Sequence, residues 1–120
     1  MTEVSPEAVE AAVDAYLEAW STTDEDRRTS LLDRSLTDDA VFSGPTGSFA
    51  GRDGVAGLIV SLRNRLGAAA VGRTGPLQPA GEGFRFAWRV QREDGSTLLE
   101  GTDEVVAATD GRLRMISMVL

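Results

Sequence analysis

The fold of this chain is indicated most directly by residues 84–111, which have the sequence FRFAWRVQREDGSTLLEGTDEVVAATDG. Apolar and polar residues alternate on both sides of the Glu-Asp-Gly-Ser sequence at 93–96, which is the period of strands with one buried face. That sequence and Thr-Asp-Gly at 109–111 are typical of tight turns. We therefore expect an antiparallel meander at the C-terminal end. Its predicted strands cover residues 84–92, 97–108 and 112–120.

The N-terminal half follows the helical period instead. Ser5-Pro6-Glu7 predicts a helix start, because Ser caps, Pro fits the first turn and Glu favours the positive end of the helix dipole. Apolar residues then recur at helical spacing as far as Trp20. The other predicted elements are helices over 25–35 and 51–67, strands over 40–43, 48–50 and 68–73, a turn at 37–39 and a loop over 74–83.

Three helices followed by a meander predict an α+β protein with its helices on one face of a curved sheet. The length of 120 residues suits one domain, so we expect a single domain over 1–120. Hydrophobic residues make up 42% of the chain, which is enough for a core, and no apolar run approaches the ~20 residues of a spanning helix.

Charge and missing residue types exclude several functions. The net charge of −7 argues against nucleic acid as a partner. Without Cys or His, the chain has no thiol nucleophile, no thiolate metal site and no His-dependent triad. It also lacks phosphate-loop and dinucleotide motifs, so we expect neither a metal nor a cofactor. The acidic start is not a signal peptide, and a cytoplasmic protein that does not bind membranes is expected.

Asp103 is the candidate catalytic residue of the predicted strand over 97–108. Alternation places it on one face with Leu99, Gly101, Val105 and Ala107, where it is the only charged residue. If that face meets the helices, burial raises the pKa of Asp103, so that the carboxyl can donate a hydrogen bond or transfer a proton near neutral pH. The alternatives are an error in the assumed strand register, or an Asp paired with a buried Arg.

Aromatic residues on neighbouring elements point to a pocket or to plain core. Phe86 and Trp88 lie on the apolar face of the strand over 84–92, and Tyr16 and Trp20 are one turn apart on the first helix. A buried Tyr hydroxyl needs a partner, either a backbone carbonyl or a group in the same cavity as Asp103. The candidate ligand-binding residues are Trp20, Phe42, Phe86, Trp88 and Val105.

Five short motifs occur in order along nearly the whole chain: AYLEAW at 15–20, LTDDA at 36–40, GRDGV at 51–55, GTD at 101–103 and DGRL at 110–113. Together they resemble the nuclear transport factor 2-like superfamily, which includes SnoaL-like polyketide cyclases and ketosteroid isomerase. The resemblance implies a cone-like, curved antiparallel (mixed) sheet wrapped around three N-terminal helices and enclosing an apolar pocket. It implies no single function, because this fold hosts unrelated chemistries.

The resemblance also assigns roles. Tyr16 matches the Tyr of the ketosteroid isomerase oxyanion hole, and Asp103 matches its protonated Asp. The general base of that family stands where this chain has Gly44, before Pro45, and glycine cannot abstract a proton. Asp103 is also similar to the acid–base Asp of SnoaL-like cyclases, whose His partner is missing here.

Two functions remain open at this point. The first is an isomerase, cyclase or hydro-lyase that uses Tyr16 and Asp103 on a hydrophobic carbonyl compound of polyketide or steroid type, without a cofactor. The second is a non-catalytic small-molecule-binding or dimerisation module with the same pocket, which the glycine at position 44 favours. In both cases we expect a hydrophobic small molecule as ligand and a homodimer formed through the open face of the sheet.

Overall fold

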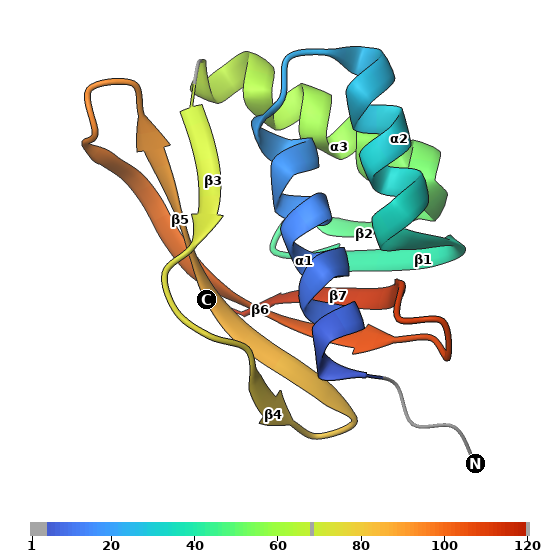
Figure 1. Ribbon diagram of the computed structural model, residues 1–120. Coiled ribbons are helices and arrows are strands. Elements are labelled where there is room, and N and C mark those ends of the chain that lie inside the picture. The colour runs from blue at the N-terminus through green and yellow to red at the C-terminus, as the bar shows by residue number, and fades with distance from the viewer. Residues whose placement is uncertain (1–4, 68, 120) are drawn as a thin grey trace.

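Three helices cover one face of a curved mixed sheet in the computed structural model, which describes residues 5–67 and 69–119 (Figure 1). The sheet order is β2-β1-β7-β6-β5-β3, with β4 paired to β5, and the sheet is not closed. The pair β1–β7 is parallel and the other pairs are antiparallel. The elements are α1 (Pro6–Ser21), α2 (Glu25–Ser35), β1 (Leu36–Gly44), β2 (Gly47–Ala50), α3 (Gly51–Leu66), β3 (Ala69–Arg73), β4 (Gln78–Ala80), β5 (Gly83–Arg92), β6 (Thr97–Ala107) and β7 (Leu113–Val119). This is the predicted α+β class.

The helix ends follow from local capping. The Ser5 hydroxyl accepts a hydrogen bond from the Ala8 amide at 3.3 Å, and the Asp24 carboxylate accepts one from the Arg27 amide at 3.1 Å. Each bond satisfies an amide that has no partner inside its helix. At the other end of α3, Gly67 adopts a φ of 75°, which favours glycine and ends the helix. All three helices therefore begin and end within a residue or two of the predicted positions.

Two expectations about strands are wrong. Residues 37–39, predicted to be a turn, belong to β1, whose pairing with β7 shifts register between Leu36 and Val41. Because of this irregularity, the polar residues 37–39 can belong to the strand without following its alternating pattern, so the sequence does not reveal them as strand residues. The predicted loop over 74–83 contains the three-residue strand β4, where Pro79 is tolerated because the strand lies at an edge. Residues 68 and 120, placed in strands by the sequence, lie outside the described residues.

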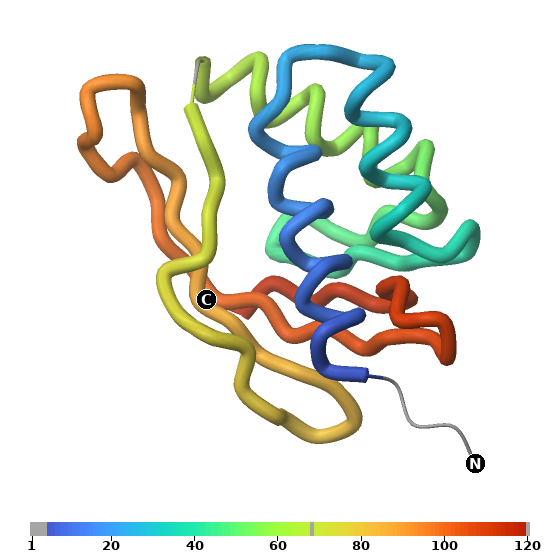
Figure 2. The backbone as a smooth tube through the Cα atoms, viewed as in Figure 1, coloured from blue at the N-terminus to red at the C-terminus, as the bar shows by residue number. Residues whose placement is uncertain are grey.

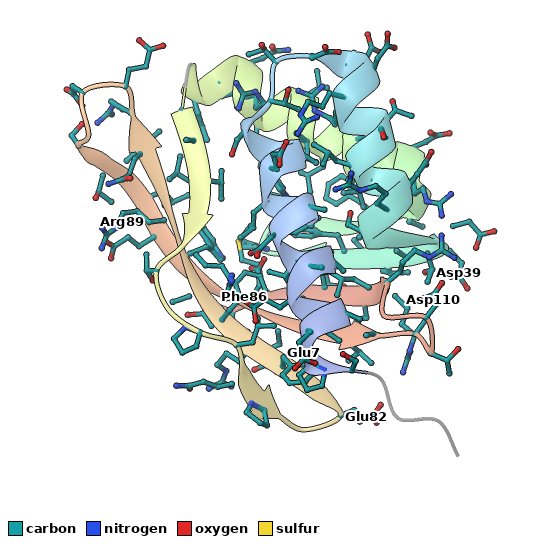
Figure 3. All side chains as sticks on the ribbon, viewed as in Figure 1. Glu7, Asp39, Glu82, Phe86, Arg89 and Asp110 are labelled. Atoms are coloured by element: carbon teal, nitrogen blue, oxygen red, sulfur yellow. The ribbon has the colours of Figure 1, made fainter. Side chains whose placement is uncertain are left out.

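The core lies between the helices and the inner face of the sheet. Phe86 on β5 points toward α1, whereas Arg89 on the same strand points to the outer face (Figure 3). The β5–β6 hairpin runs on to an exposed turn at 93–96, shown in orange in Figure 2. Leu99, close to this turn on β6, is 45% exposed although it lies on the face predicted to be buried. Among the described residues, no helix has both the length and the apolar character needed to cross a membrane.

Candidate functional site

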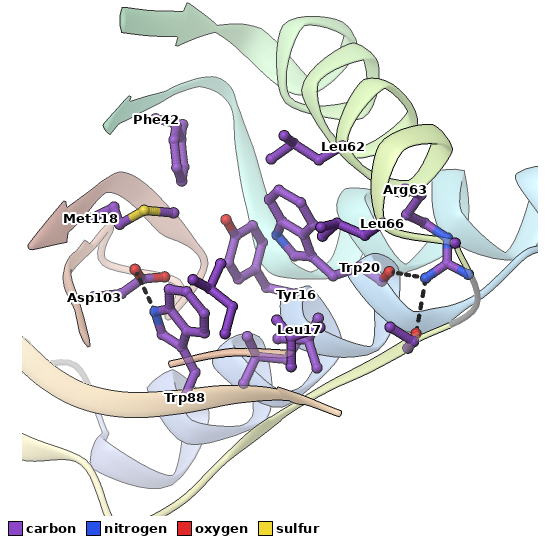
Figure 4. Close-up of a pocket in the computed structure, with 15 residues that line it drawn as sticks. Tyr16, Leu17, Trp20, Phe42, Leu62, Arg63, Leu66, Trp88, Asp103 and Met118 are labelled. Atoms are coloured by element: carbon purple, nitrogen blue, oxygen red, sulfur yellow. Dashed lines mark hydrogen bonds between the residues drawn. The ribbon is translucent and has the colours of Figure 1, made fainter. Parts of the chain in front are cut away.

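A narrow pocket of about 60 Å³ lies where the ends of α1 and α3 meet the inner face of the sheet (Figure 4). Its walls are almost entirely apolar. Among the described residues that line it, Asp103 and Arg63 carry the only charges, and Tyr16 contributes a hydroxyl. The pocket is therefore mostly apolar with a few polar groups, as small-molecule sites usually are.

The structure brings most of the candidate residues together in this pocket. Those that line it are Tyr16, Trp20, Phe42, Trp88 and Asp103. Phe86 and Val105, named as ligand-binding candidates from the sequence, are instead buried in the core and do not line it. Phe86 pairs directly with Asp103 across β5 and β6, so it stands beside the site without facing its space.

Sequence reasoning missed several lining residues. Leu62 and Leu66, which follow the apolar period of the helix predicted over 51–67, both reach the pocket. Arg63 lies between them and Met118 comes from the last strand; neither had a sequence signal of its own. At the end of a helix, apolar and charged residues can line the same pocket. A periodicity analysis instead assigns these two kinds of residue to separate faces of the helix.

Asp103 is the most unusual group in the pocket. Its side chain is only 3% exposed, and Trp88 Nε1 donates a hydrogen bond to Asp103 Oδ1 at 2.9 Å. Burial raises the pKa of Asp103 to about 7, and the Trp88 hydrogen bond opposes that rise. A substantial fraction of Asp103 is therefore neutral at pH 7, as the sequence led us to expect.

No arginine within the described residues pairs with Asp103. The nearest candidates by sequence, Arg85 and Arg89, lie on the outer face of β5 and pair there with glutamates of β6. Arg85 contacts Glu104 at 2.6 Å and Arg89 contacts Glu100 at 3.1 Å. The alternative of a buried Arg–Asp pair is therefore not what the structure shows.

The position of Trp88 depends on Gly101, its partner across β5 and β6. A Cβ on Gly101 would lie 2.3 Å from Trp88 Cζ2 and 2.9 Å from Cε2, far inside contact distance. The indole therefore occupies the space where a side chain at 101 would be. This lets the ring lean along β6 until its N–H reaches Asp103, two residues further along the same face.

Tyr16 supplies the second polar group of the inner end. It is buried and packs edge-on against Trp20, with ring centroids 6.4 Å apart. Its hydroxyl points toward the side of the pocket where Asp103 and Met118 lie (Figure 4). Burial, followed by the charge of Asp103, raises the pKa of Tyr16 above its ordinary value. Tyr16 therefore stays protonated and can act as a hydrogen-bond donor.

A scan against protein-family models finds no match to this sequence, and a search of the curated proteins finds none. Solved structures are similar over almost the whole chain. A SnoaL-like family protein from Agrobacterium tumefaciens, provisionally assigned as an isomerase, is 25% identical, with a TM-score of 0.83 over 95% of this chain and 99% of that one. A provisionally assigned polyketide cyclase from Sinorhizobium meliloti is 19% identical, with a TM-score of 0.67 over 96% and 99%.

A third similar structure is a protein with a ketosteroid isomerase-like fold from Catenulispora acidiphila, solved in complex with trimethylamine. It is 12% identical, with a TM-score of 0.68 over 91% of this chain and 84% of that one. The chain has the nuclear transport factor 2-like fold. The curved mixed sheet under three helices, implied by the sequence motifs, is thus the arrangement that this chain shares with SnoaL-like and ketosteroid isomerase-like proteins.

In this nuclear transport factor 2-like chain, Gly44 ends β1 beside the pocket. A Cβ there would lie 2.9 Å from Phe42 Cε1 and 3.7 Å from Met118 Cβ, and both of these residues line the pocket. The position thus faces the site but carries no side chain. Asp103 is the only carboxylate among the described residues that line the pocket.

Proposed function

We propose that this nuclear transport factor 2-like protein binds a hydrophobic carbonyl compound and moves a proton next to its carbonyl group, as an isomerase, cyclase or hydro-lyase without a cofactor. The observation that carries the proposal is the buried carboxyl of Asp103 at the end of an apolar pocket, with a pKa near 7. A general acid or base works best when its pKa lies near the working pH. Such a perturbed carboxyl is also costly to keep unless it has a role.

The two polar groups divide the chemistry between them. Tyr16 donates a hydrogen bond to the carbonyl oxygen and stabilises the negative charge that develops there. The ionised Asp103 takes the proton from the carbon next to the carbonyl, which leaves an enolate. It then returns the proton to another carbon of the conjugated system. Trp88 occupies Oδ1 of Asp103, so Oδ2 is the oxygen available to the substrate.

Cavity size restricts the substrate. A dry cavity of about 150 Å³ holds one benzene molecule, and this pocket measures only about 60 Å³. The reacting end of the substrate is therefore small or narrow. A compound of polyketide or steroid size fits only with its bulk outside, over the exposed side chains of Leu66 and Leu99.

Exchange of the α-protons of acetone in D₂O, followed by proton NMR, tests the chemistry with a ketone small enough for the pocket. We expect the exchange rate to rise with pH through about 7, because Asp103 acts as a base only when ionised. Asp103→Asn removes the base and Tyr16→Phe removes the donor, so both should reduce exchange by about 100-fold or more. Glu93→Gln, in the exposed turn, is the matched control and should behave as wild type.

An exchange rate no higher than that in buffer would overturn the catalytic proposal. The second candidate function, a non-catalytic binding module, would then be favoured by the missing side chain at Gly44. In that case Asp103→Asn should bind the same ligand as wild type, because Asn keeps the shape and the Trp88 acceptor. Native mass spectrometry of the two proteins as purified from cells compares their bound small molecules directly.

We further propose that the outer face of the sheet joins a second copy of the chain. Met115 and Val119 are each about two-fifths exposed there, and Val41 and Val106 flank Met115 on the neighbouring strands. The charges on this face are already paired across β5 and β6. Two copies can therefore approach without like charges opposing each other.

Light scattering at micromolar concentration should accordingly give the mass of a dimer for wild type. Met115→Glu places a charge in the proposed interface and should give the mass of a monomer. Val60→Glu is the matched control, because Val60 is also 42% exposed but lies on α3. A monomeric wild type, or equal dissociation by both variants, contradicts the proposed interface.

A further inference from the structure

Arg63 lies at the rim of the pocket, on the opposite side of the cluster from Asp103 (Figure 4). It belongs to the last turn of α3, and its Nη1 donates to the carbonyl oxygens of Trp20 at 2.6 Å and Ala69 at 3.2 Å. These two bonds hold the guanidinium where the end of α1 meets β3. Nε and Nη2 make no hydrogen bond within residues 5–67 and 69–119, so two nitrogens with three N–H groups remain for a ligand.

The positive charge at this rim is not balanced by a carboxylate. Seven arginines have carboxylate partners within the described part of the chain: Arg27, Arg52, Arg73, Arg85, Arg89, Arg112 and Arg114. Arg63 has none there, and neither does the buried Arg28, which donates to the carbonyls of Ala19 and Thr22. Burial and then the charge of Arg28 lower the pKa of Arg63, although arginine stays protonated.

The ends of α1 and α3 compensate only part of this charge. A helix C-terminus carries roughly half a negative charge, so the ends of α1 and α3 together supply about one, whereas Arg28 and Arg63 bring two full positive charges. A local excess of positive charge therefore remains beside the pocket, in a protein whose net charge is −7. The overall charge repels anions at long range, so an anion must be recognised here by direct contact.

Between the two ends the wall is apolar. Leu66 and Leu99 are 37% and 45% exposed, two of the most exposed large apolar side chains described, and both border the pocket. The sequence of environments is thus a carboxyl and a phenol at the inner end, an apolar wall, and a cation at the rim. A ligand that satisfies all three is itself apolar in its middle and anionic at one end.

We infer that the pocket takes an anionic amphiphile, a short aliphatic chain whose carboxylate binds Arg63 while its far end points toward Asp103. The carboxylate accepts from Nε and Nη2, a fork geometry that guanidinium groups favour. The carbonyl compound of the proposed function is then an oxo acid rather than a neutral ketone. The presence of a carbonyl group near Asp103 rests on the proposed function. The binding of a carboxylate at Arg63 does not, because it is argued from the rim of the pocket alone.

Three six-carbon probes test the anionic end: hexanoate, hexan-1-ol and hexylamine. Both tryptophans of the chain line the pocket, so intrinsic fluorescence reports binding without a label. In low salt we expect hexanoate to bind about tenfold or more tightly than hexan-1-ol, as a hydrogen-bonded charge pair should give, and hexylamine to bind least. Raising the salt concentration should weaken hexanoate binding and leave hexan-1-ol unchanged.

Variants separate the role of Arg63 in binding from its role in packing. Arg63→Gln should remove the preference for hexanoate and keep the affinity for hexan-1-ol, and Arg63→Lys should keep part of the preference. Arg65→Gln is the matched control, because Arg65 is exposed on the same helical turn and does not line the pocket. If Arg63→Gln unfolds, the salt dependence measured on wild type and the Arg65→Gln control still distinguish the outcomes.

Equal affinities of wild type for hexanoate and hexan-1-ol would overturn the inference and leave the proposed function standing. A preference that survives in Arg63→Gln would do the same. The reverse outcome, hexanoate preferred but no exchange of acetone protons, would reject the catalytic proposal and keep the anionic rim. If no probe binds at millimolar concentration, the inference is wrong, and the exchange measurement alone decides the proposed function.

Discussion

Asp103→Asn should stabilise the protein above neutral pH, by about 4 kcal/mol at pH 8. In the folded protein the pKa of Asp103 is raised from 3.8 to about 7 by burial. A pKa difference of one corresponds to about 1.4 kcal/mol, so the ionised Asp103 costs the folded state about 4 kcal/mol. Asn removes this cost and still offers Trp88 an acceptor oxygen.

The pH dependence gives the sign of the effect. Between about pH 4 and 7 the folded protein binds more protons than the unfolded chain, so its stability falls as the pH rises. Below that window both states are protonated and Asp103 costs nothing; above it the full cost is present. The advantage of Asp103→Asn should therefore be absent near pH 4, grow up to pH 7 and then stay constant.

Urea unfolding of both proteins between about pH 4 and pH 8.5 measures this difference. Glu93→Gln removes one exposed negative charge from a turn and should show no such trend. A stability difference that does not change with pH would mean that Asp103 is ionised throughout, with a cation or a bound ligand beside it. The proton-transfer role of Asp103 would then be untenable.

Gly101→Ala should destabilise the protein by about 1–3 kcal/mol, the usual cost of forcing an extra methyl group into a filled space. The new Cβ would lie 2.3 Å from Trp88 Cζ2, so the indole has to move off β6. Its N–H then leaves Asp103 Oδ1, and the pKa of Asp103 should rise further because the bond that favours its charged form is lost.

Unfolding in urea gives the stability, and the indole N–H signals of the two tryptophans in an NMR spectrum give the position of Trp88. Gly72→Ala is a matched control in β3, where nothing lies within 4 Å of an added Cβ. If Gly101→Ala leaves the Trp88 signal and the stability as in Gly72→Ala, the indole is not held by the absence of a side chain at 101.

Local interactions explain why so much of the fold could be predicted. Ser5 and Asp24 cap their helices through atoms a few residues away, and Gly67 ends α3 through its own backbone conformation. The alternation of β5 and β6 around the turn at 93–96 likewise needs no distant partner. The same alternation placed Asp103 on the buried face, and its raised pKa followed from burial alone.

Two of the features that the sequence did not predict depend on how separate strands pair. Residues 37–39 join β1 only because β7, more than seventy residues later, lies beside it in parallel. The hydrogen bond from Trp88 to Asp103 depends on the register of β5 against β6 and on the bare Gly101 between them. Neither the pairing nor the register is encoded by a local pattern.

Periodicity along the chain therefore established the helices, most strands, the buried face of β6 and the acid on it. It could not say which buried residues face a void and which fill the core, because both kinds share one face of one strand. Phe86 packs in the core, whereas Arg63 is held at the rim of the pocket by hydrogen bonds to carbonyl oxygens of α1 and β3. That division depends on how the end of α3 packs against the sheet, which is a property of the assembled structure.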